Sequence, residues 1–193
     1  MSEFKVDAIT NRNGSHGPQI CGITTFGGSG LTIPSGGLSG ARGRGFFAGG
    51  ETPSEVNIID KIEIATTGSA TDFGDLTFVR DQSGGASSST RGLFAGGRAP
   101  EISTINYVIL SSEGNGYVFG DLTEVWNSGK GVSDNITAVW MGGEWSGSYT
   151  GDMKMEYSII ASLGNGYNFG NLSNQRVYSQ TASFESPTRG FIG

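Results

Sequence analysis

The seven residues at 91–97, Arg-Gly-Leu-Phe-Ala-Gly-Gly, constrain the fold most, because close copies of them recur along the chain. The copies end in a pair of glycines and stand at 44–50, 91–97 and 137–143, and residues 189–193 resemble the opening of another. The first glycines of the three complete pairs lie 47 and then 46 positions apart. Self-similarity at a period of this length is typical of propellers and solenoids. We therefore expect an array of similar units.

A second landmark, the dipeptide Phe-Gly, recurs in the same phase as the double glycines. It begins at Phe73, Phe119 and Phe169, and a Gly-Asn-Gly-Tyr segment precedes the second and third copies, starting at Gly114 and Gly164. We interpret these Gly-Asn-Gly segments as hairpin turns in which Asn and Gly supply positive φ. A phosphate-binding loop is disfavoured, because neither a Lys-Ser or Lys-Thr pair nor a helix follows.

The stretches between the landmarks predict several short strands in each unit. Runs of β-branched and aromatic residues, bounded by turn formers, occupy 58–64, 105–110 and 155–160. Glycine supplies 34 of the 193 residues without the period of collagen, so tight turns between many strands explain it best. The predicted fold class is all-β.

Charge and cysteine content exclude several classes of function. The formal net charge of −6 argues against a nucleic-acid partner, which needs clustered Lys and Arg. Cys21 is the only cysteine, so one chain forms neither an internal disulfide nor a thiolate metal site. The sequence shows no secretion signal and no membrane-spanning stretch, so we expect a protein made in a cytoplasm and not inserted into a membrane.

Residues 1–40 lack the repeat and form a separate segment. Apolar residues predict strands at 4–9 and 19–26, separated by turn formers at 11–18, and a glycine-rich linker follows. The segment has too little apolar content to fold alone. We expect its strands to pair with a neighbouring copy or with another protein.

The order of residues in this segment resembles a known family. Lys-Val-Asp-Ala-Ile-Thr-Asn-Arg at 5–12, Gly-Pro-Gln-Ile at 17–20 and Gly-Ile-Thr-Thr-Phe at 22–26 resemble an amino-terminal module of virion proteins, including tail fibres, of tailed phages, particularly marine cyanophages. The repeats resemble kelch-like units, with Tyr107 and Tyr157 at one expected position. They depart from the kelch pattern because no Trp recurs in phase.

The resemblance implies an extended attachment segment at 1–40 followed by a kelch-like β-propeller-type domain at 41–193. Its repeats are expected at about 41–90, 91–136 and 137–188, with a partial fourth at 189–193. The candidate particle-attachment residues are apolar residues of the first segment: Phe4, Val6, Ile9, Ile20, Ile23 and Phe26. Because propellers typically need about four blades, the chain is expected either to be part of a longer polypeptide or to assemble with other copies.

Polar residues that recur in phase suggest either a ligand site or contacts between units. One repeat position holds Arg44, Arg91 and Arg189, and another holds Asp75, Asp121 and Asn171. Recurrence in every unit favours hydrogen bonds from each Arg to carbonyls or to the Asp of a neighbouring unit, because a ligand site seldom needs all copies.

The sequence favours a protein that is not an enzyme and that has no catalytic, metal or cofactor site. His16 is the only histidine, and it stands in a glycine-rich turn without a nucleophile nearby in the sequence. Asp72, Asp75 and Asp81 lack the ligand spacing of a known calcium loop.

Aromatic residues of the third repeat are candidates for a glycan contact. The double glycine there is followed by a longer loop, 144–151, which carries Trp145 and Tyr149. Flat aromatic faces stack well on sugar rings. Loops that lengthen on one face of a repeat array commonly form its binding face. Trp140 takes the place of Phe47 and Phe94, so we interpret it as a core residue.

The resemblance and the repeats together imply a structural component of a phage virion, such as a tail fibre. The first segment is expected to anchor it to tail, neck or capsid proteins, and the repeats to project toward a host-surface glycan. A homotrimer is expected from the habit of phage fibres. Two alternatives stay open: a capsid or neck decoration protein without receptor binding, and a free-standing glycan-binding β-propeller.

Overall fold

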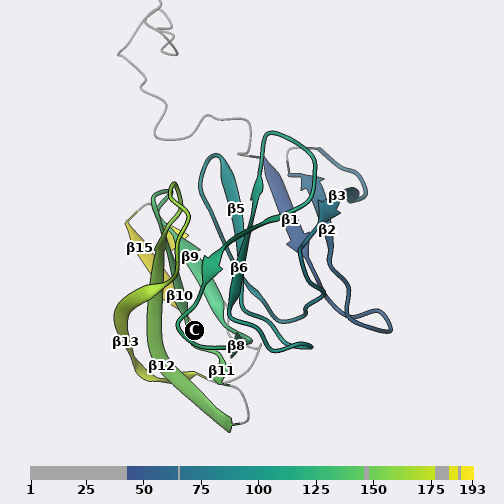
Figure 1. Cartoon of the computed structure of the whole chain (residues 1–193). Coiled ribbons are helices and arrows are strands. Elements are labelled where there is room, and N and C mark those ends of the chain that lie inside the picture. Colours follow the sequence, from purple (N-terminus) through teal and green to yellow (C-terminus); the bar gives the residue numbers. More distant parts are fainter. Residues whose placement is uncertain (1–42, 65, 146–147, 177–182, 187) are drawn as a thin grey trace, which may run out of the picture. The chain divides into compact units, whose positions relative to one another are not determined.

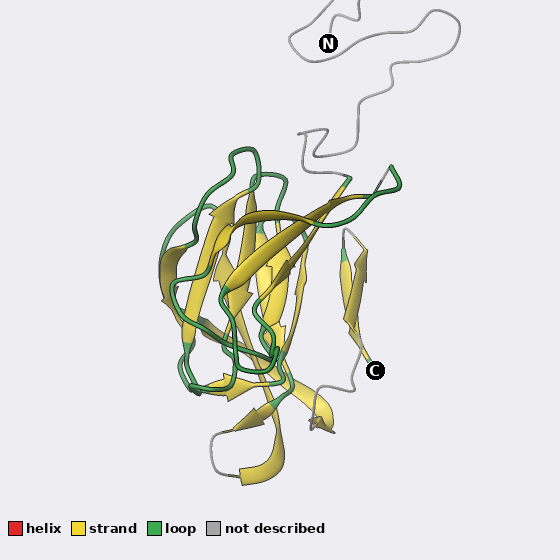
Figure 2. Cartoon of the chain, turned by 90° about the vertical axis from the view of Figure 1, so that its right-hand side faces the viewer, coloured by secondary structure: helices red, strands yellow, loops and turns green. Residues whose placement is uncertain are grey.

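The computed structural model describes residues 43–64, 66–145, 148–176, 183–186 and 188–193. The chain divides into two units, Met1–Leu38 and Ser39–Gly193, and every described residue belongs to the second. The described residues form fifteen β-strands in antiparallel sheets and no helix (Figures 1 and 2), so the all-β prediction is confirmed. The candidate attachment residues all lie outside the described residues: Phe4, Val6, Ile9, Ile20, Ile23 and Phe26.

The first two sheets follow the order of the chain (Figure 1). The first sheet consists of β1 (Arg44–Ala48), β2 (Ile58–Glu63) and β3 (Thr71–Asp75), in the order β1-β2-β3. The second sheet has the order β4-β5-β6-β7 and consists of β4 (Gly84–Ser87), β5 (Arg91–Ala95), β6 (Thr104–Ile109) and β7 (Tyr117–Asp121). The Phe-Gly landmark lies in the last strand of each sheet.

The third sheet contains more strands than either of the first two, and the fourth is a two-stranded hairpin. The main part of the third sheet consists of β9 (Lys130–Ser133), β10 (Thr137–Met141), β12 (Ser148–Ile159) and β13 (Tyr167–Arg176). Its extension consists of β8 (Trp126–Asn127) and β11 (Glu144–Trp145), and β11 pairs with the start of β12. The fourth sheet consists of β14 (Ser183–Ser186) and β15 (Arg189–Ile192).

The sheets are offset from the sequence repeats by one strand. β4 precedes the Arg-Gly motif, yet it pairs with β5, with Gly84 opposite Ala95 and Ser87 opposite Gly92. In the same way β9 pairs with β10, and β14 pairs with β15. In these three sheets the motif that opens a sequence repeat is therefore the second strand, and the first strand comes from the end of the preceding repeat.

A capped turn joins the first strand of each of these sheets to the second. In the second sheet the Ser88 hydroxyl accepts hydrogen bonds from the backbone amides of Thr90 at 3.2 Å and Arg91 at 3.0 Å. Asp134 and Ser186 accept from the amides two and three residues further on in the third and fourth sheets. Short polar side chains favour such turns because they satisfy local backbone donors.

Two clusters of buried apolar residues lie between successive sheets. The first cluster belongs to the first and second sheets and contains Ile59, Phe73, Leu76, Phe94, Val108 and Leu110. The second belongs mainly to the second and third sheets and contains Leu93, Ala95, Ile105, Phe119, Leu122, Trp126, Ala138, Trp140 and Ile160. Trp140 is buried, and its Nε1 donates to the Ser158 hydroxyl at 3.3 Å, so its interpretation as a core residue is confirmed. Full burial of a large apolar side chain stabilises the fold by about 1.5–3 kcal/mol.

Candidate functional site

The two candidate glycan-contact residues lie on the extension of the third sheet. Trp145 ends β11, and Tyr149 is the second residue of β12. Trp145 stands opposite Ser148, so the backbones of the two candidates are close together in one hairpin. On the other side of β11, Trp145 stands opposite Trp126 of β8. The contact of the two candidate side chains with a sugar stays a prediction.

The segment expected to be a long loop is largely extended strand. β12 has 12 residues, whereas β6, its counterpart in the second sheet, has 6. The additional residues of β12 pair with β11, which lengthens the third sheet at the end where β8 and β11 lie (Figure 1). The extension therefore holds the two aromatic residues on strand backbone rather than on an irregular loop.

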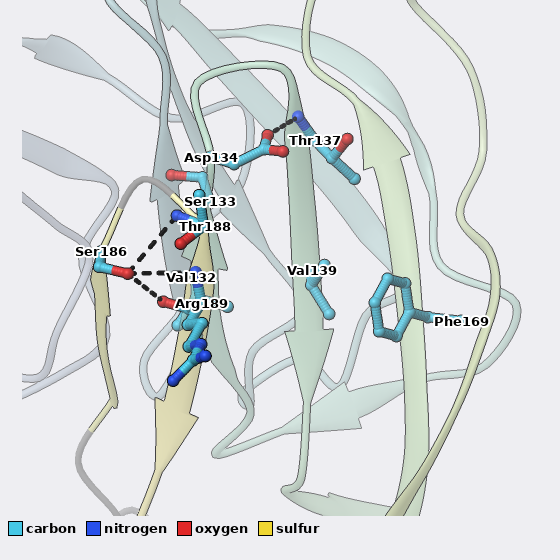
Figure 3. Close-up of a pocket in the computed structure, with 10 residues that line it drawn as sticks. Val132, Ser133, Asp134, Thr137, Val139, Phe169, Ser186, Thr188 and Arg189 are labelled. Atoms are coloured by element: carbon cyan, nitrogen blue, oxygen red, sulfur yellow. Dashed lines mark hydrogen bonds between the residues drawn. The ribbon is translucent and has the colours of Figure 1, made fainter. Parts of the chain in front are cut away.

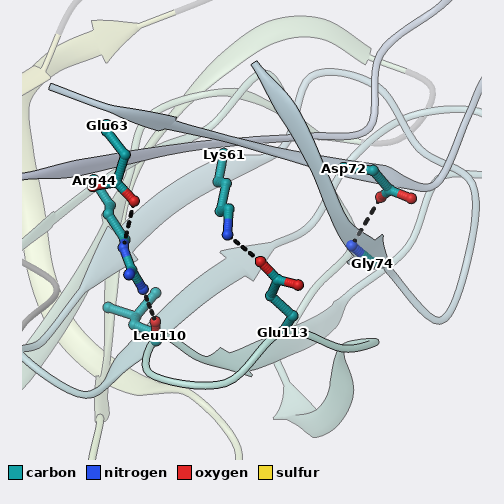
Figure 4. A network of polar contacts seen from close by, with 7 residues as sticks. All are labelled: Arg44, Lys61, Glu63, Asp72, Gly74, Leu110 and Glu113. Atoms are coloured by element: carbon teal, nitrogen blue, oxygen red, sulfur yellow. Dashed lines mark hydrogen bonds and ion pairs between the residues drawn. The ribbon is translucent and has the colours of Figure 1, made fainter. Parts of the chain in front are cut away.

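The recurring arginines bind carbonyl groups of the next sheet. Arg44 Nη1 donates to the carbonyl oxygen of Leu110 at 3.0 Å (Figure 4), and Arg91 Nη1 donates to that of Ile160 at 2.8 Å. Leu110 directly follows β6, and Ile160 directly follows β12, so the two bonds are equivalent. The structural interpretation of these two arginines is confirmed. Arg189, in β15, is exposed.

The Gly-Asn-Gly loop of the second sheet binds the edge of the first sheet. The Gly114 amide donates to the Phe73 carbonyl oxygen at 2.9 Å, and the Gly116 amide donates to the Asp75 carbonyl oxygen at 2.7 Å. Between them, Asn115 Oδ1 accepts from the Asp75 amide at 3.1 Å. The loop thus supplies backbone and side-chain partners to an edge strand, whose polar groups need them.

The third sheet binds the second sheet with the same three hydrogen bonds. The Gly164 amide donates to the Phe119 carbonyl oxygen at 3.0 Å, and the Gly166 amide donates to the Asp121 carbonyl oxygen at 2.8 Å. Asn165 Oδ1 accepts from the Asp121 amide at 3.1 Å. The contact is therefore a property of the repeat and not of one pair of sheets.

The prediction that asparagine supplies positive φ in these loops is wrong. Within the two Gly-Asn-Gly segments, positive φ occurs at the first glycine, +143° at Gly114 and +155° at Gly164. The asparagines have another role, because their side-chain oxygens bind the strand of the neighbouring sheet. Sequence reasoning missed this role because the acceptor and the donor are about 40 residues apart, at the separation of one repeat.

The glycine of the Phe-Gly landmark makes room for the incoming loop. A Cβ on Gly74 would stand 2.5 Å from the carbonyl carbon and oxygen of Gly114. A Cβ on Gly120 would stand 2.2 Å from the carbonyl oxygen of Gly164. Both separations are far below van der Waals contact, so any side chain would displace the loop. The two sequence landmarks are therefore the two halves of one contact between sheets.

The aspartates considered for calcium make separate contacts. Asp72 Oδ1 accepts from the Gly74 amide at 3.0 Å (Figure 4), and Asp81 Oδ2 pairs with Arg98 Nη2 at 3.0 Å. The backbone of Asp75 binds the loop of the second sheet. In the part of the chain that the structure describes, no group of three His, Cys, Asp or Glu residues is placed to hold a metal ion.

Sequence reasoning also missed Arg80, which is buried between the first and second sheets. Its Nη1 donates to the carbonyl oxygens of Gly96 and Thr104, each at 3.0 Å, and its Nη2 donates to Asn106 Oδ1 at 2.6 Å. Burial lowers the pKa of Arg80 to about 10. The equivalent position of the next repeat is Trp126, so recurrence does not mark Arg80 in the sequence.

A buried carboxylate joins the second and third sheets. Glu156 accepts hydrogen bonds from the backbone amide of Thr123 at 2.9 Å and from its hydroxyl. Lys154 Nζ lies 2.9 Å from Glu124 Oε1 and 3.3 Å from Glu156 Oε1. Partial burial acts to lower the pKa of Lys154, but the hydrogen bonds and charges of Glu124 and Glu156 outweigh it and raise that pKa. Lys154 and Glu156 of the third sheet therefore contact residues 123 and 124, which follow the last strand of the second sheet.

A cavity of about 190 Å³ opens between the third and fourth sheets (Figure 3). Val139 and Phe169 of the third sheet line it, and Arg189 of the fourth sheet lies on its other side. Phe169 is 55% exposed, whereas its counterparts Phe73 and Phe119 are 4% and 3% exposed. Val132, Val139 and Phe169 form the apolar part of the lining, and polar side chains, including Asp134 and Arg189, form much of the rest.

A scan against protein-family models finds no match for the chain, and a search of curated proteins finds none. The described residues include no helix that is long and apolar enough to cross a membrane.

Proposed function

We propose that the chain is a structural, non-enzymatic component of a phage virion, such as a tail fibre or a similar appendage. Residues 1–40 attach it to other virion proteins of the tail, neck or capsid. The sheets project outward and adhere to a host-surface glycan, with Trp145 and Tyr149 as the proposed contacts. The protein is made in the host cytoplasm and works in the virion, without a nucleic-acid partner or membrane insertion.

The observation that carries the proposal is that the recurring polar residues bind neighbouring sheets. Arg44 and Arg91 donate to carbonyl groups of the next sheet, and Asn115 and Asn165 accept from strand amides of the preceding one. The residues that define the repeat thus hold the sheets together. In repeat arrays, such contacts between neighbours supply much of the stability. This use of side chains suits a mechanical element that projects from a particle.

We propose a propeller-type arrangement of kelch-like units for the sheets. Its support is the order of contacts between them. The first strands of neighbouring sheets lie side by side. A Cβ on Gly131 of β9 would stand 2.3 Å from the carbonyl oxygen of Gly85 in β4. The hydroxyl of Ser183 in β14 donates to the Gly131 carbonyl oxygen at 3.1 Å. At the opposite edge, the last strands of the first two sheets, β3 and β7, each bind a loop of the next sheet. Blades arranged around an axis require these two kinds of contact.

We further propose that the working form is a homotrimer, in which residues 1–40 pair between copies or against the particle. This proposal is supported by the strand pattern of the segment and by its low apolar content. Light scattering on the full-length chain and on a chain lacking residues 1–40 tests it. A monomer in both forms, with the first segment already protected from proteolysis, would contradict it.

The virion role is tested by the protein inventory of purified particles. Mass spectrometry is expected to find the chain in stoichiometric amounts, and its absence from intact particles would overturn the proposal. A glycan array, with Trp145→Ala and Tyr149→Ala as variants, tests the adhesive role. Particles that contain the chain without any glycan binding would favour a decoration protein of the capsid or neck. Glycan binding by a chain that is absent from particles would favour a free-standing glycan-binding propeller.

A further inference from the structure

The two Gly-Asn-Gly loops contain the dipeptide Asn-Gly, at residues 115–116 and 165–166. In water an asparagine followed by glycine readily loses its side-chain amide, because glycine is conformationally free and has no side chain that shields its backbone nitrogen. Asn115 and Asn165 are both exposed to solvent. The dipeptide and its exposure together favour deamidation at these two positions. A third Asn-Gly dipeptide, at residues 13–14, lies outside the described residues.

Deamidation at an Asn-Gly dipeptide needs only water as a co-reactant. The backbone nitrogen of the glycine gives its proton to a solvent base and bonds to Cγ of the asparagine. The bond between Cγ and Nδ2 breaks, and this nitrogen takes up a proton and leaves as ammonia. Water then opens the cyclic imide at one of its carbonyl carbons, so the product is aspartate or isoaspartate. Isoaspartate carries an additional carbon in the backbone.

The hydrogen bonds between a Gly-Asn-Gly loop and the preceding sheet, together called the loop contact, hold both reacting groups. At the first loop the Gly116 amide donates its proton to the Asp75 carbonyl oxygen at 2.7 Å, and Asn115 Oδ1 accepts from the Asp75 amide at 3.1 Å. Ring closure requires that the nitrogen lose this proton and that the asparagine side chain turn toward it. Both changes break hydrogen bonds of the loop contact, so the closed contact opposes the geometry that the reaction needs.

The second loop holds the same atoms in the same way. The Gly166 amide donates to the Asp121 carbonyl oxygen at 2.8 Å, and Asn165 Oδ1 accepts from the Asp121 amide at 3.1 Å. Gly116 and Gly166 are buried although the asparagine before each of them is exposed. The attacking nitrogen is therefore enclosed at both loops, and it becomes available only when the loop leaves the strand that it binds.

We propose that Asn115 and Asn165 are deamidation sites that the loop contact protects, and that each reacts with water only while its own contact is open. The isoaspartate product lengthens the backbone between the two amides of the loop that bind the preceding sheet, those of Gly114 and Gly116 at the first site. These amides then no longer match the spacing of the Phe73 and Asp75 carbonyl oxygens. Deamidation thus makes a transient separation of two sheets permanent.

The first sheet provides a matched site without a loop contact. Residues 68–70, Gly-Ser-Ala, occupy the positions of residues 114–116 in the repeat. All three are exposed, and no hydrogen bond joins them to a described strand of another sheet. The double substitution Ser69→Asn and Ala70→Gly therefore places the same tripeptide in an exposed loop of the same chain.

The test incubates this double variant of the full chain at mildly alkaline pH and follows aspartate and isoaspartate by peptide mapping with mass spectrometry. In the folded chain we expect the introduced Asn-Gly dipeptide to deamidate about tenfold faster, or more, than Asn115 and Asn165. In guanidinium chloride we expect the three sites to react at similar rates, because the loop contacts are then lost.

Two glycine variants assign each site to its own loop contact. A Cβ on Gly74 would stand 2.5 Å from the carbonyl carbon of Gly114, and a Cβ on Gly120 would stand 2.2 Å from the carbonyl oxygen of Gly164. Gly74→Ala is therefore expected to accelerate deamidation at Asn115 about tenfold and to leave Asn165 unchanged, and Gly120→Ala is expected to do the reverse.

Three results would overturn the proposal. Asn115 and Asn165 could react in the folded double variant as fast as the introduced site, or they could stay slow in guanidinium chloride. The two glycine variants, shown to be folded by circular dichroism, could also accelerate both sites equally. If a glycine variant does not fold, the comparison of the three sites in the double variant decides alone.

Discussion

Gly120 and Gly164 approach so closely that a Cβ on Gly120 would stand 2.2 Å from the carbonyl oxygen of Gly164. The Gly164 amide also donates to the carbonyl oxygen of Phe119, the residue before Gly120, at 3.0 Å. Backbone therefore packs directly on backbone where the second and third sheets meet. This contact explains why the Phe-Gly and Gly-Asn-Gly segments recur in one phase.

The first prediction is that Gly120→Ala destabilises the fold. The added methyl group displaces the loop and weakens its hydrogen bonds, and overpacking of this kind costs about 1–3 kcal/mol. The urea midpoint of the full chain measures the effect. Gly85→Ala is the matched control, because a Cβ on Gly85 has no atom within 4 Å and Gly85 lies in a strand of the same sheet. Equal losses in the two variants would contradict the role of the loop contact.

The second prediction is that Arg91→Met weakens the join between the second and third sheets. It removes the hydrogen bond to the Ile160 carbonyl oxygen and the contact of the guanidinium with the Tyr107 ring, which lies 4.9 Å away. Hydrogen bonds to charged groups contribute about 1.5–3 kcal/mol. Because the methionine side chain retains part of the packing of the arginine stem, we expect the free energy of unfolding to fall by about 1–2 kcal/mol. Chemical denaturation measures it.

Arg189→Met is the control for Arg91→Met. Arg189 occupies the same position of the repeat but is exposed, and substitutions at such surface sites usually change stability by less than about 0.5 kcal/mol. If Arg189→Met destabilises the chain as much as Arg91→Met does, the carbonyl bond is not the cause.

The sequence was sufficient to predict strands whose residues favour β-structure on their own. The run predicted at 58–64 matches β2, and the run predicted at 105–110 matches β6 within one residue at each end. The first strands of the sheets were not predicted, because residues such as Gly84 and Gly85 of β4 have low strand propensity and are held by pairing with β5.

The contacts between sheets could be predicted only in part. Recurrence correctly favoured a structural contact for Arg44 and Arg91, with carbonyl groups as one of two expected partners, and both arginines donate to carbonyl groups of the next sheet. Arg80 has no such signal, since its bonds depend on where the Gly96 and Thr104 carbonyls lie after the sheets have packed. Sequence spacing likewise placed Trp145 and Tyr149 in one segment, but it did not indicate that this segment extends a sheet.

The third prediction is that Arg80→Met is among the most destabilising single substitutions in the first two sheets. Methionine fills part of the volume but removes the Arg80 donor from the carbonyl oxygens of Gly96 and Thr104 and from Asn106 Oδ1. The Gly96 amide still donates to the Thr104 carbonyl oxygen, and the Thr77 hydroxyl still donates to Asn106 Oδ1. Leaving a buried donor or acceptor unsatisfied costs about 1–3 kcal/mol for each group. Thermal and urea unfolding measure the loss.

Trp126→Met is the comparison for Arg80→Met, because Trp126 occupies the equivalent buried position between the second and third sheets. That substitution removes apolar volume without removing a bonded charge.

A double-mutant cycle tests whether Arg80 and Asn106 are coupled. If Asn106→Ala lowers the free energy of unfolding equally in the Arg80→Met background and in the natural chain, the two residues are not coupled. The coupling expected for a hydrogen-bonded pair is about 0.5–3 kcal/mol.

The last prediction concerns the ion pair between Lys61 of β2 and Glu113, which precedes the Gly-Asn-Gly loop (Figure 4). The hydrogen bond and the positive charge of Lys61 lower the pKa of Glu113 from its ordinary value of 4.5. The folded chain therefore binds fewer protons at this carboxyl than the unfolded chain does. The pair stabilises the fold above pH 4.5, and this contribution is lost as the pH falls through the folded pKa.

We therefore expect Glu113→Gln to lower the urea midpoint slightly at pH 7 and the difference from the natural chain to shrink as the pH is lowered below 4.5. Added salt is expected to reduce the difference at pH 7, because Glu113 is exposed and its charge is screened. Lys61→Met provides the control: in that background only the weaker influence of the Arg44 charge remains, so Glu113→Gln is expected to have a much smaller effect at either pH. A difference that persists undiminished in the Lys61→Met background, or that grows toward acid pH, would show that the ion pair does not couple the first and second sheets.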